Sequence, residues 1–244
     1  MTSIHTEIDK SIQQIRKLTY EPYIEKVIGK PTVPVFFVQL LHLLMESYGI
    51  PKQRAHVYCV ATTLLKMGLD LHENVSLLQE RELKKIRARQ LYVLAGDYFS
   101  SLFYHLMSSH QETEGIQCLA KALSRINEAK MTRYFVSDHE QKQLQSQMIE
   151  SNLLTALADF FHVEKDLCDL WHRLFPPLLL LHMAEEEYKE SNSFSVTNKV
   201  QIAWFEAKKA VSELTKGEVK AMLSERITKW ATLIKDDPLV KGGF

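Results

Sequence analysis

Histidine and carboxylate groups at helical spacing are the first residues of this sequence that could do chemistry. Asp169 and His172 lie three positions apart, and His182 precedes the acidic run Glu185–Glu187. On a helix this spacing places two metal ligands on one face. A dimetal site in a helical bundle, however, needs a glutamate from each of two helices and an ExxH motif from each of two others. The sequence lacks that set, so we expect no metal site and interpret the acidic run as a solvated face.

Nucleotide binding and nucleophilic catalysis find no support. The eight glycines are too dispersed for a dinucleotide-binding fingerprint or a P-loop, and no GxSxG motif occurs. Cys59, Cys118 and Cys168 lie in apolar helical patterns, which are typical of small buried residues. They form no CxxC pair and are too few for a disulfide framework, so a reducing cytosol is the simplest expectation.

The most informative stretch runs from residue 90 to 107 and carries two stripes of side chains at helical spacing. One stripe is rich in hydroxyl groups and contains Asp97, Ser101, Tyr104 and Ser108. The other stripe is apolar and consists of Tyr92, Ala95, Phe99, Leu102, Phe103 and Leu106. We therefore expect both faces of this helix to be covered.

Gly96 lies in the middle of this predicted helix, where a glycine costs about 1 kcal/mol relative to alanine. Its presence suggests that another backbone or ring comes close at this point. The neighbouring Asp97 would need a partner, because an unpaired buried carboxylate is expensive. We interpret Asp97 as a satisfied structural group, with a substrate contact as the alternative.

The elements that must position these residues are helices. Isoleucines at helical spacing predict a helix over 3–17, and the cluster of prolines and glycine in 20–34 indicates a connector. Gly49 is a plausible helix C-cap, and Pro176-Pro177 should kink or break its helix. Further helices are predicted over 35–48, 52–73, 80–109, 114–130, 138–162, 165–190, 198–215 and 218–235. We expect one all-α domain over 1–244, a bundle of about eight to ten helices that could surround an apolar cavity, with 1–34 as an N-terminal helix and connector.

Composition agrees with a packed helical protein. Of 244 residues, 45% are hydrophobic and 25% are charged, and glycine and proline together are scarce. The 30 basic residues balance the 30 acidic ones, so no charge excess draws the chain to nucleic acid or anionic lipid. The N-terminus has no basic region followed by an apolar stretch, and the longest charge-free segment of the first half, 31–45, is too short for a membrane span.

The segment VLAGDYFSSLFYHL, residues 93–106, resembles the helix of trans-prenyl diphosphate synthases that reads LAGD followed by aromatic or aliphatic residues. Upstream, residues 69–77 resemble the position of their first aspartate-rich motif, DDxxD, which follows a histidine. At the three aspartate positions this chain has Glu73, Asn74 and Leu77. In that family the motif holds Mg²⁺ ions that bridge to the allylic diphosphate, and hard cations need clustered carboxylate oxygens. The resemblance implies that the position is vestigial here.

The family's other signatures are also altered. The second aspartate-rich motif is missing, since Asp236-Asp237 is followed by Pro238 and lacks the third aspartate. The Arg-Arg-Gly element is replaced by residues 80–89, which keep basic character without the motif. The resemblance in motifs extends over residues 35–110. In the rest of the chain, the only resemblance is that the residues are predicted to form helices.

A prenyl synthase scaffold without metal ligands resembles component 1 of the heterodimeric heptaprenyl diphosphate synthases. The resemblance implies a non-catalytic subunit that binds no cofactor itself, and the cysteines indicate that it is cytoplasmic. Its catalytic partner would carry both DDxxD motifs and the Mg²⁺. Together they would elongate farnesyl diphosphate with isopentenyl diphosphate to give the side chain of menaquinone.

The resemblance also implies roles for particular residues. Related homodimers pair through helices of this region, so the candidate partner interface comprises Leu94, Gly96, Asp97, Tyr98, Ser101, Leu102 and Tyr104. Gly68 and Leu69 fall where the growing chain would be bound. Packing inside this chain is the alternative for both sets. Two other functions stay open: a helical adaptor without an isoprenoid role, and a stand-alone terpene-forming enzyme, which would need a metal cluster.

Overall fold

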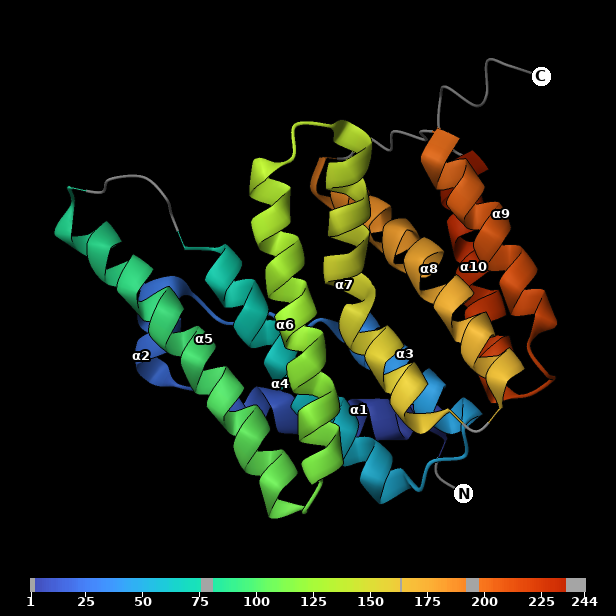
Figure 1. Ribbon diagram of the computed structural model, residues 1–244, viewed down its shortest axis with the longest axis horizontal. Coiled ribbons are helices and arrows are strands. Elements are labelled where there is room, and N and C mark those ends of the chain that lie inside the picture. The colour runs from blue at the N-terminus through green and yellow to red at the C-terminus, as the bar shows by residue number, and fades with distance from the viewer. Residues whose placement is uncertain (1–2, 76–80, 163, 192–197, 236–244) are drawn as a thin grey trace. The chain divides into compact units, whose positions relative to one another are not determined.

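The computed structural model describes residues 3–75, 81–162, 164–191 and 198–235 (Figure 1). Within these ranges the chain forms helices and no strand, as the sequence predicts, and none of these helices has both the length and the apolarity needed to cross a membrane. They are α1 (Ile4–Leu18), α2 (Pro22–Ile28), α3 (Val35–Ser47), α4 (Lys52–Glu73), α5 (Leu83–Ser109), α6 (Thr113–Phe135), α7 (His139–Phe161), α8 (Lys165–Ser191), α9 (Asn198–Glu213) and α10 (Glu218–Lys235). The chain divides into two compact units, Met1–Ala120 and Lys121–Phe244. The expectation of a single domain stays a prediction.

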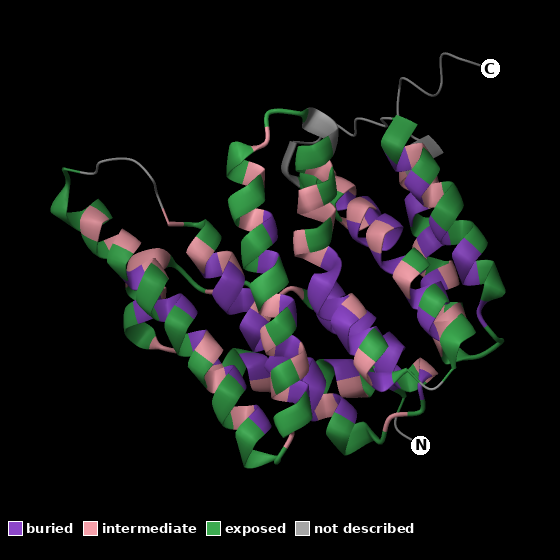
Figure 2. Ribbon diagram, in the orientation of Figure 1, coloured by how far each residue is buried: buried purple, intermediate pink, exposed green. Residues whose placement is uncertain are grey.

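Helices α3 and α4 form the centre of the first unit. Helix α1 packs against both of them, α4 pairs with α5, and α2 contacts α5. Helix α3 and the middle of α4 are apolar on almost all sides. A helix of this kind is buried by neighbours on several sides. Leu40, Leu44, Tyr58 and Leu64 have no exposed surface. Figure 2 shows the resulting contrast with α5, on which buried and exposed residues alternate along the helix.

Two local signals define the N-terminal part of this unit. Gly49 follows α3 with a positive φ of 64°. The backbone N–H of Gly49 donates to the backbone oxygen of Glu46, and that of Ile50 donates to the backbone oxygen of Met45. These bonds confirm the predicted C-cap. The prediction that residues 20–34 only connect helices is wrong, because α2 lies within them. Pro22 occupies the first turn of α2, where its missing N–H costs nothing.

The second unit is built from successive helices that pack on their neighbours, α7 on α8, α8 on α9, and α9 on α10. Trp171, Phe175 and Trp230 form its buried aromatic centre. Helix α8 continues through Pro176 and Pro177, so of the two predicted outcomes, a kink or a break, the break does not occur. Each proline removes one backbone donor, and the burial of the apolar residues around the pair offsets that loss.

Candidate functional site

Gly68 of α4 and Gly96 of α5 lie where the backbones of these two helices meet. A Cβ atom at Gly68 would lie 2.9 Å from the carbonyl oxygen of Gly96, and one at Gly96 would lie 2.7 Å from the ring of His72. Neither position has room for a side chain. The predicted close approach at Gly96 is confirmed, and the neighbour is this chain's own α4.

This contact corrects the assignment of Gly96 to the partner interface. Gly96 is buried under α4, so a second chain cannot reach it. Gly68, a candidate for the chain-binding pocket, faces α5 instead, and its neighbour Leu69 is buried, with 8% of its surface exposed. The sequence pattern indicated a crowded face correctly but did not identify the crowding element.

The opposite side of α5 is open in this chain. The α5 outer face is defined here as Leu94, Asp97, Tyr98, Ser101 and Tyr104, residues at helical spacing that are all exposed. Leu94 exposes 62% of its surface, Tyr98 38% and Tyr104 43%. The expectation that both faces of this helix are covered is therefore wrong for this chain alone.

Two polar residues of the α5 outer face have neighbours within this chain. The hydroxyl of Ser101 donates to the Tyr98 backbone oxygen at 2.7 Å, and Asp97 lies 3.4 Å from His72 Nε2. The Asp97 side chain is 69% exposed, so it is not the buried carboxylate considered in the sequence analysis. Leu102, also predicted at the interface, is half-buried beside this face.

The vestigial motif position lies at the C-terminal end of α4. Glu73 is the last residue of α4 and is exposed, while the Asn74 amide donates to the Asp70 backbone oxygen at 3.2 Å. Asp70 pairs with Lys66 at 2.7 Å. Leu77 lies outside the described residues. Among the residues that the structure describes, this region presents no cluster of carboxylates that could hold a hard cation.

A cleft of about 350 Å³ lies beside this end of α4. Lys30 and Asp70 are its charged residues, and most of its other lining residues are apolar. No sequence pattern pointed to Lys30, because the residues around it resemble a connector. The lining consists of Ile28, Gly29, Lys30, Pro31, Thr32, Pro34, Met67, Asp70, Leu71, Asn74, Tyr92 and Phe99, and so does not include Gly68 or Leu69.

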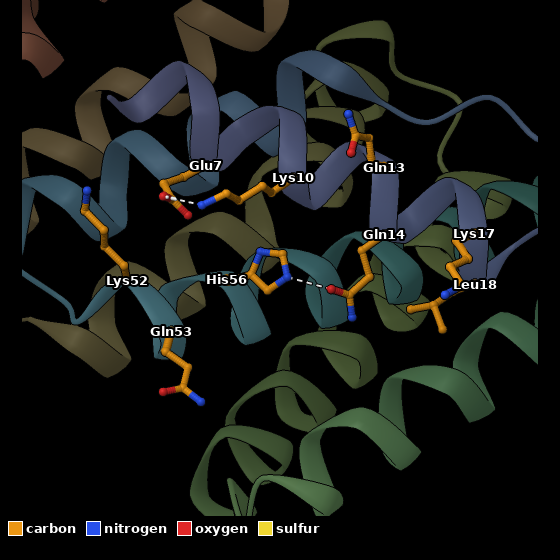
Figure 3. Close-up of a pocket in the computed structure, with 9 residues that line it drawn as sticks. All are labelled: Glu7, Lys10, Gln13, Gln14, Lys17, Leu18, Lys52, Gln53 and His56. Carbon is orange, nitrogen blue, oxygen red and sulfur yellow. Dashed lines mark hydrogen bonds and ion pairs between the residues drawn. The ribbon is translucent and has the colours of Figure 1, made fainter. Parts of the chain in front are cut away.

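A second hollow, of about 750 Å³, lies between α1 and the start of α4 (Figure 3). It is lined by Glu7, Lys10, Gln13, Gln14, Lys17, Leu18, Lys52, Gln53 and His56. Figure 3 shows the ion pair between Glu7 and Lys10 at its rim, with a nitrogen–oxygen distance of 3.0 Å, and the contact of His56 with Gln14 at its floor.

Beneath this hollow a hydrogen-bond chain ties α1 to α3 and α4. The Gln14 Oε1 can only accept, so His56 Nε2, 2.6 Å away, donates to it. The neutral His56 then accepts at Nδ1 from the Ser11 hydroxyl at 2.8 Å, and Ser11 Oγ accepts from His42 Nε2 at 2.9 Å. Burial, together with the repulsion that a protonated His56 would exert, lowers the pKa of His42 to about 4, and burial also lowers the pKa of His56. Both imidazoles are therefore neutral near pH 7.

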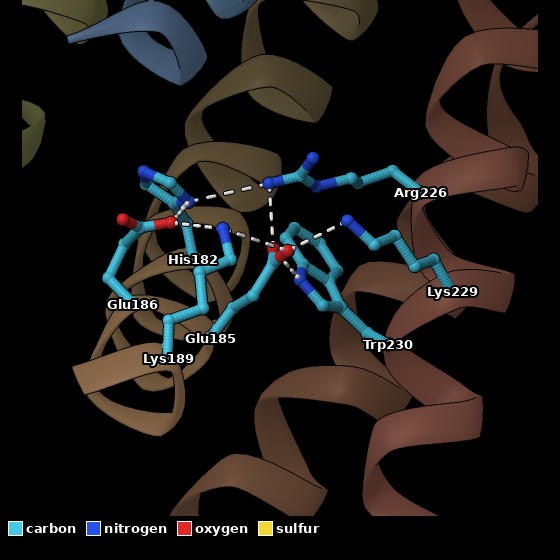
Figure 4. A network of polar contacts seen from close by, with 7 residues as sticks. All are labelled: His182, Glu185, Glu186, Lys189, Arg226, Lys229 and Trp230. Carbon is cyan, nitrogen blue, oxygen red and sulfur yellow. Dashed lines mark hydrogen bonds and ion pairs between the residues drawn. The ribbon is translucent and has the colours of Figure 1, made fainter. Parts of the chain in front are cut away.

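Glu185 is the centre of a polar network in the second unit (Figure 4). It is 1% exposed and accepts hydrogen bonds from Arg226 at 2.8 Å, Lys229 at 2.9 Å and Trp230 at 2.9 Å. Burial alone would raise the pKa of Glu185, but the bonds from Lys229 and Trp230 and the charge of Arg226 lower it to about 2. The interpretation of Glu185 as part of a solvated face is wrong, because α10 covers it.

Solved structures of prenyl synthases share this fold. Heptaprenyl diphosphate synthase from Staphylococcus aureus superposes with a TM-score of 0.68 at 12% identity, over 95% of this chain and 98% of that one. Decaprenyl diphosphate synthase from Rhodobacter capsulatus gives 0.66 at 13% identity, over 96% and 98% of the two chains. The geranyl diphosphate synthase small subunit from Antirrhinum majus gives 0.56 at 14% identity, over 94% and 100%. The expected isoprenoid synthase fold is confirmed.

Sequence comparison is more specific. Heptaprenyl diphosphate synthase component 1 from Geobacillus stearothermophilus is 38% identical over 118 residues, which are 48% of this chain and 52% of that relative. The chain thus aligns with about half the length of this curated relative. Residues 21–231 match the family model described as heptaprenyl diphosphate synthase (HEPPP synthase) subunit 1. Because this match spans most of the 244 residues, the chain belongs to the family of heptaprenyl diphosphate synthase subunit 1.

Proposed function

We propose that this chain is the non-catalytic subunit of a heterodimeric heptaprenyl diphosphate synthase, which elongates farnesyl diphosphate with isopentenyl diphosphate for the menaquinone side chain. The observation that supports the proposal is a prenyl synthase fold in which the described residues form no carboxylate cluster at the end of α4. Glu73 there is exposed, and the amide of Asn74 is bound to its own helix. Ionisation of an allylic diphosphate needs cations that neutralise the leaving group, and clustered carboxylates hold them.

The partner subunit then supplies the chemistry. It carries both DDxxD motifs and binds the Mg²⁺, whereas this chain contributes helices and no magnesium ligand. The three cysteines are all free thiols, which supports a reducing compartment, and we place the complex in the cytoplasm.

The partner binds to the α5 outer face and to Leu102 beside it. Leu94, Tyr98 and Tyr104 expose apolar and aromatic surface that a second chain could bury, and tyrosine is enriched at such contacts. Gly96 is not part of this surface, and its contact with Gly68 holds α5 close to α4.

Leu94→Asp tests this assignment against a matched control. Leu94 and Ile202 are both exposed, at 62% and 56%, so neither substitution should disturb folding. If Leu94 becomes buried by the partner, an unpaired carboxylate there costs at least about 2 kcal/mol, or about 30-fold in affinity.

Each variant is mixed with a catalytic subunit that carries both motifs, and co-elution and product chain length are measured. Leu94→Asp should fail to co-elute and should lose the long prenyl product, while Ile202→Asp behaves as the unmodified chain. Normal co-elution of Leu94→Asp would remove α5 from the interface. A different result would contradict the proposed function itself: the unmodified chain forms the complex, but the product is the same as that of the catalytic subunit alone.

A further inference from the structure

The turn between α7 and α8 brings together three side chains that are ligands of divalent metals in other proteins. Asp159 lies in the last turn of α7, and Cys168 and His172 lie one helical turn apart on α8. By sequence spacing, His172 pairs with Asp169 on the same helix. In the structure His172 Nε2 instead lies 2.8 Å from Asp159 Oδ1, across the contact between the two helices.

The three ligand atoms are close enough to share one ion. The Asp159 carboxylate oxygen, the Cys168 sulfur and His172 Nε2 all lie within 4.8 Å of one another, and the sulfur is 3.5 Å from Asp159 Oδ1. Around a tetrahedral Zn²⁺, ligand atoms of these types lie roughly 3.3 to 3.6 Å apart. The sulfur–oxygen distance already matches, and the nitrogen–oxygen distance needs to widen by only about 0.5 Å.

We propose that Asp159, Cys168 and His172 bind a soft divalent cation of the Zn²⁺ or Co²⁺ class. A thiolate and an imidazole favour such ions over Mg²⁺ and Ca²⁺, which prefer oxygen ligands alone. The site is therefore separate in kind from the magnesium chemistry of prenyl transfer. It also departs from the expectation, made from the sequence, that this chain binds no metal.

Protons and charges balance in this arrangement. The Cys168 thiol releases one proton to solvent, and His172 binds through Nε2 as a neutral imidazole with its hydrogen on Nδ1. One thiolate and one carboxylate neutralise the two positive charges of the ion. Cys168 is buried at 8% exposure, while the His172 and Asp159 side chains are 39% and 56% exposed, so the ion can arrive from solvent.

A bound ion joins the last turn of α7 to the first turns of α8. Because the unfolded chain does not hold these three ligands together, binding should stabilise the folded second unit. Three protein ligands also leave a fourth tetrahedral position for water.

The test is a Co²⁺ titration of the metal-free, full-length chain, followed through the sulfur-to-cobalt charge-transfer band in the near ultraviolet. We expect one Co²⁺ per chain, displacement by Zn²⁺ but not by Mg²⁺, and a rise in melting temperature with Zn²⁺. Cys168→Ser should abolish the band and weaken Zn²⁺ binding by at least about 100-fold, since losing even an indirect supporting group costs 10- to 100-fold.

Two matched variants separate this site from its surroundings. Cys118→Ser removes another thiol. His162→Gln removes a nearby imidazole, whose Nδ1 is hydrogen-bonded to the Asp159 backbone oxygen. Both should keep the band. Circular dichroism verifies folding, and if Cys168→Ser fails to fold, the near-isosteric Asp159→Asn takes its place. No thiolate band in the unmodified chain, or a band that survives Cys168→Ser, would overturn the proposal.

Discussion

Acidification should destabilise the first unit through His42, because this buried imidazole is neutral in the folded chain. Burial, and repulsion from His56 once that ring is protonated, lower the pKa of His42 to about 4, while the unfolded chain has the ordinary value of 6.5. As the pH falls, the unfolded chain therefore binds the proton first. Stability that is fully present above pH 6.5 is lost progressively as the pH falls towards 4.

The size of the effect follows from the two pKa values. The gap between 6.5 and 4 corresponds to about 3.4 kcal/mol in total, at about 1.36 kcal/mol for each tenfold change in proton affinity. Only part of it is lost at pH 5, where the folded chain is still largely unprotonated at His42. Between pH 8 and pH 5 the expected loss from His42 is about 2 kcal/mol.

Urea unfolding followed by circular dichroism measures this loss. The matched variant is His42→Gln, which keeps an N–H donor for Ser11 but has no titratable ring. The free energy of unfolding should fall by about 2 kcal/mol more in the unmodified chain than in the variant between pH 8 and pH 5. Equal pH dependence in the two proteins would refute the assignment of a neutral, buried His42.

Three further predictions, one of them with a matched control variant, concern other parts of the chain. Gly96→Leu should destabilise this chain by about 1 to 3 kcal/mol, because overpacking against α4 strains its own core; a variant with unchanged thermal stability that fails to bind the partner would contradict this. Glu185→Gln should lower the free energy of unfolding in urea by about 3 kcal/mol, since it leaves buried donors without their charge partner. Glu186→Gln, at an exposed ion pair, should lower it by less than about 1 kcal/mol. Equal losses in the two variants would disprove the role of burial. Glu73→Ala should leave the activity and Mg²⁺ dependence of the reconstituted complex unchanged, and lost turnover in an intact complex would show that the position is functional.

The helices themselves could be predicted closely from the sequence. Their apolar periodicity and end signals are local, so α4 was predicted with the bounds that the structure has, Lys52–Glu73. The misses concern proline. In α2, Pro22 starts a short helix. The other prolines and the glycine of this segment made it resemble a connector. The Glu21 side chain completes the N-cap by accepting a hydrogen bond from the Ile24 N–H at 2.7 Å. In α8, packing of the surrounding residues outweighs the two missing donors.

The candidate site could be predicted only in part, because periodicity indicates which face is crowded and not what crowds it. The crowding at Gly96 was predicted, while its neighbours His72 and Gly68 became known only from the structure. Glu185 shows the same limit, since its partners lie some forty residues later on α10. The spacing of residue types along one helix does not indicate which distant helix it contacts.

The most direct test of the central claim is an isopentenyl incorporation assay on three samples: this chain alone, a catalytic subunit with both DDxxD motifs alone, and their mixture. Radiolabelled isopentenyl diphosphate is supplied with farnesyl diphosphate and Mg²⁺, and product length is resolved by chromatography. The account predicts no incorporation by this chain alone and long prenyl product from the mixture. Long prenyl product from this chain alone would contradict it, because the cations would then have to be held without a carboxylate cluster.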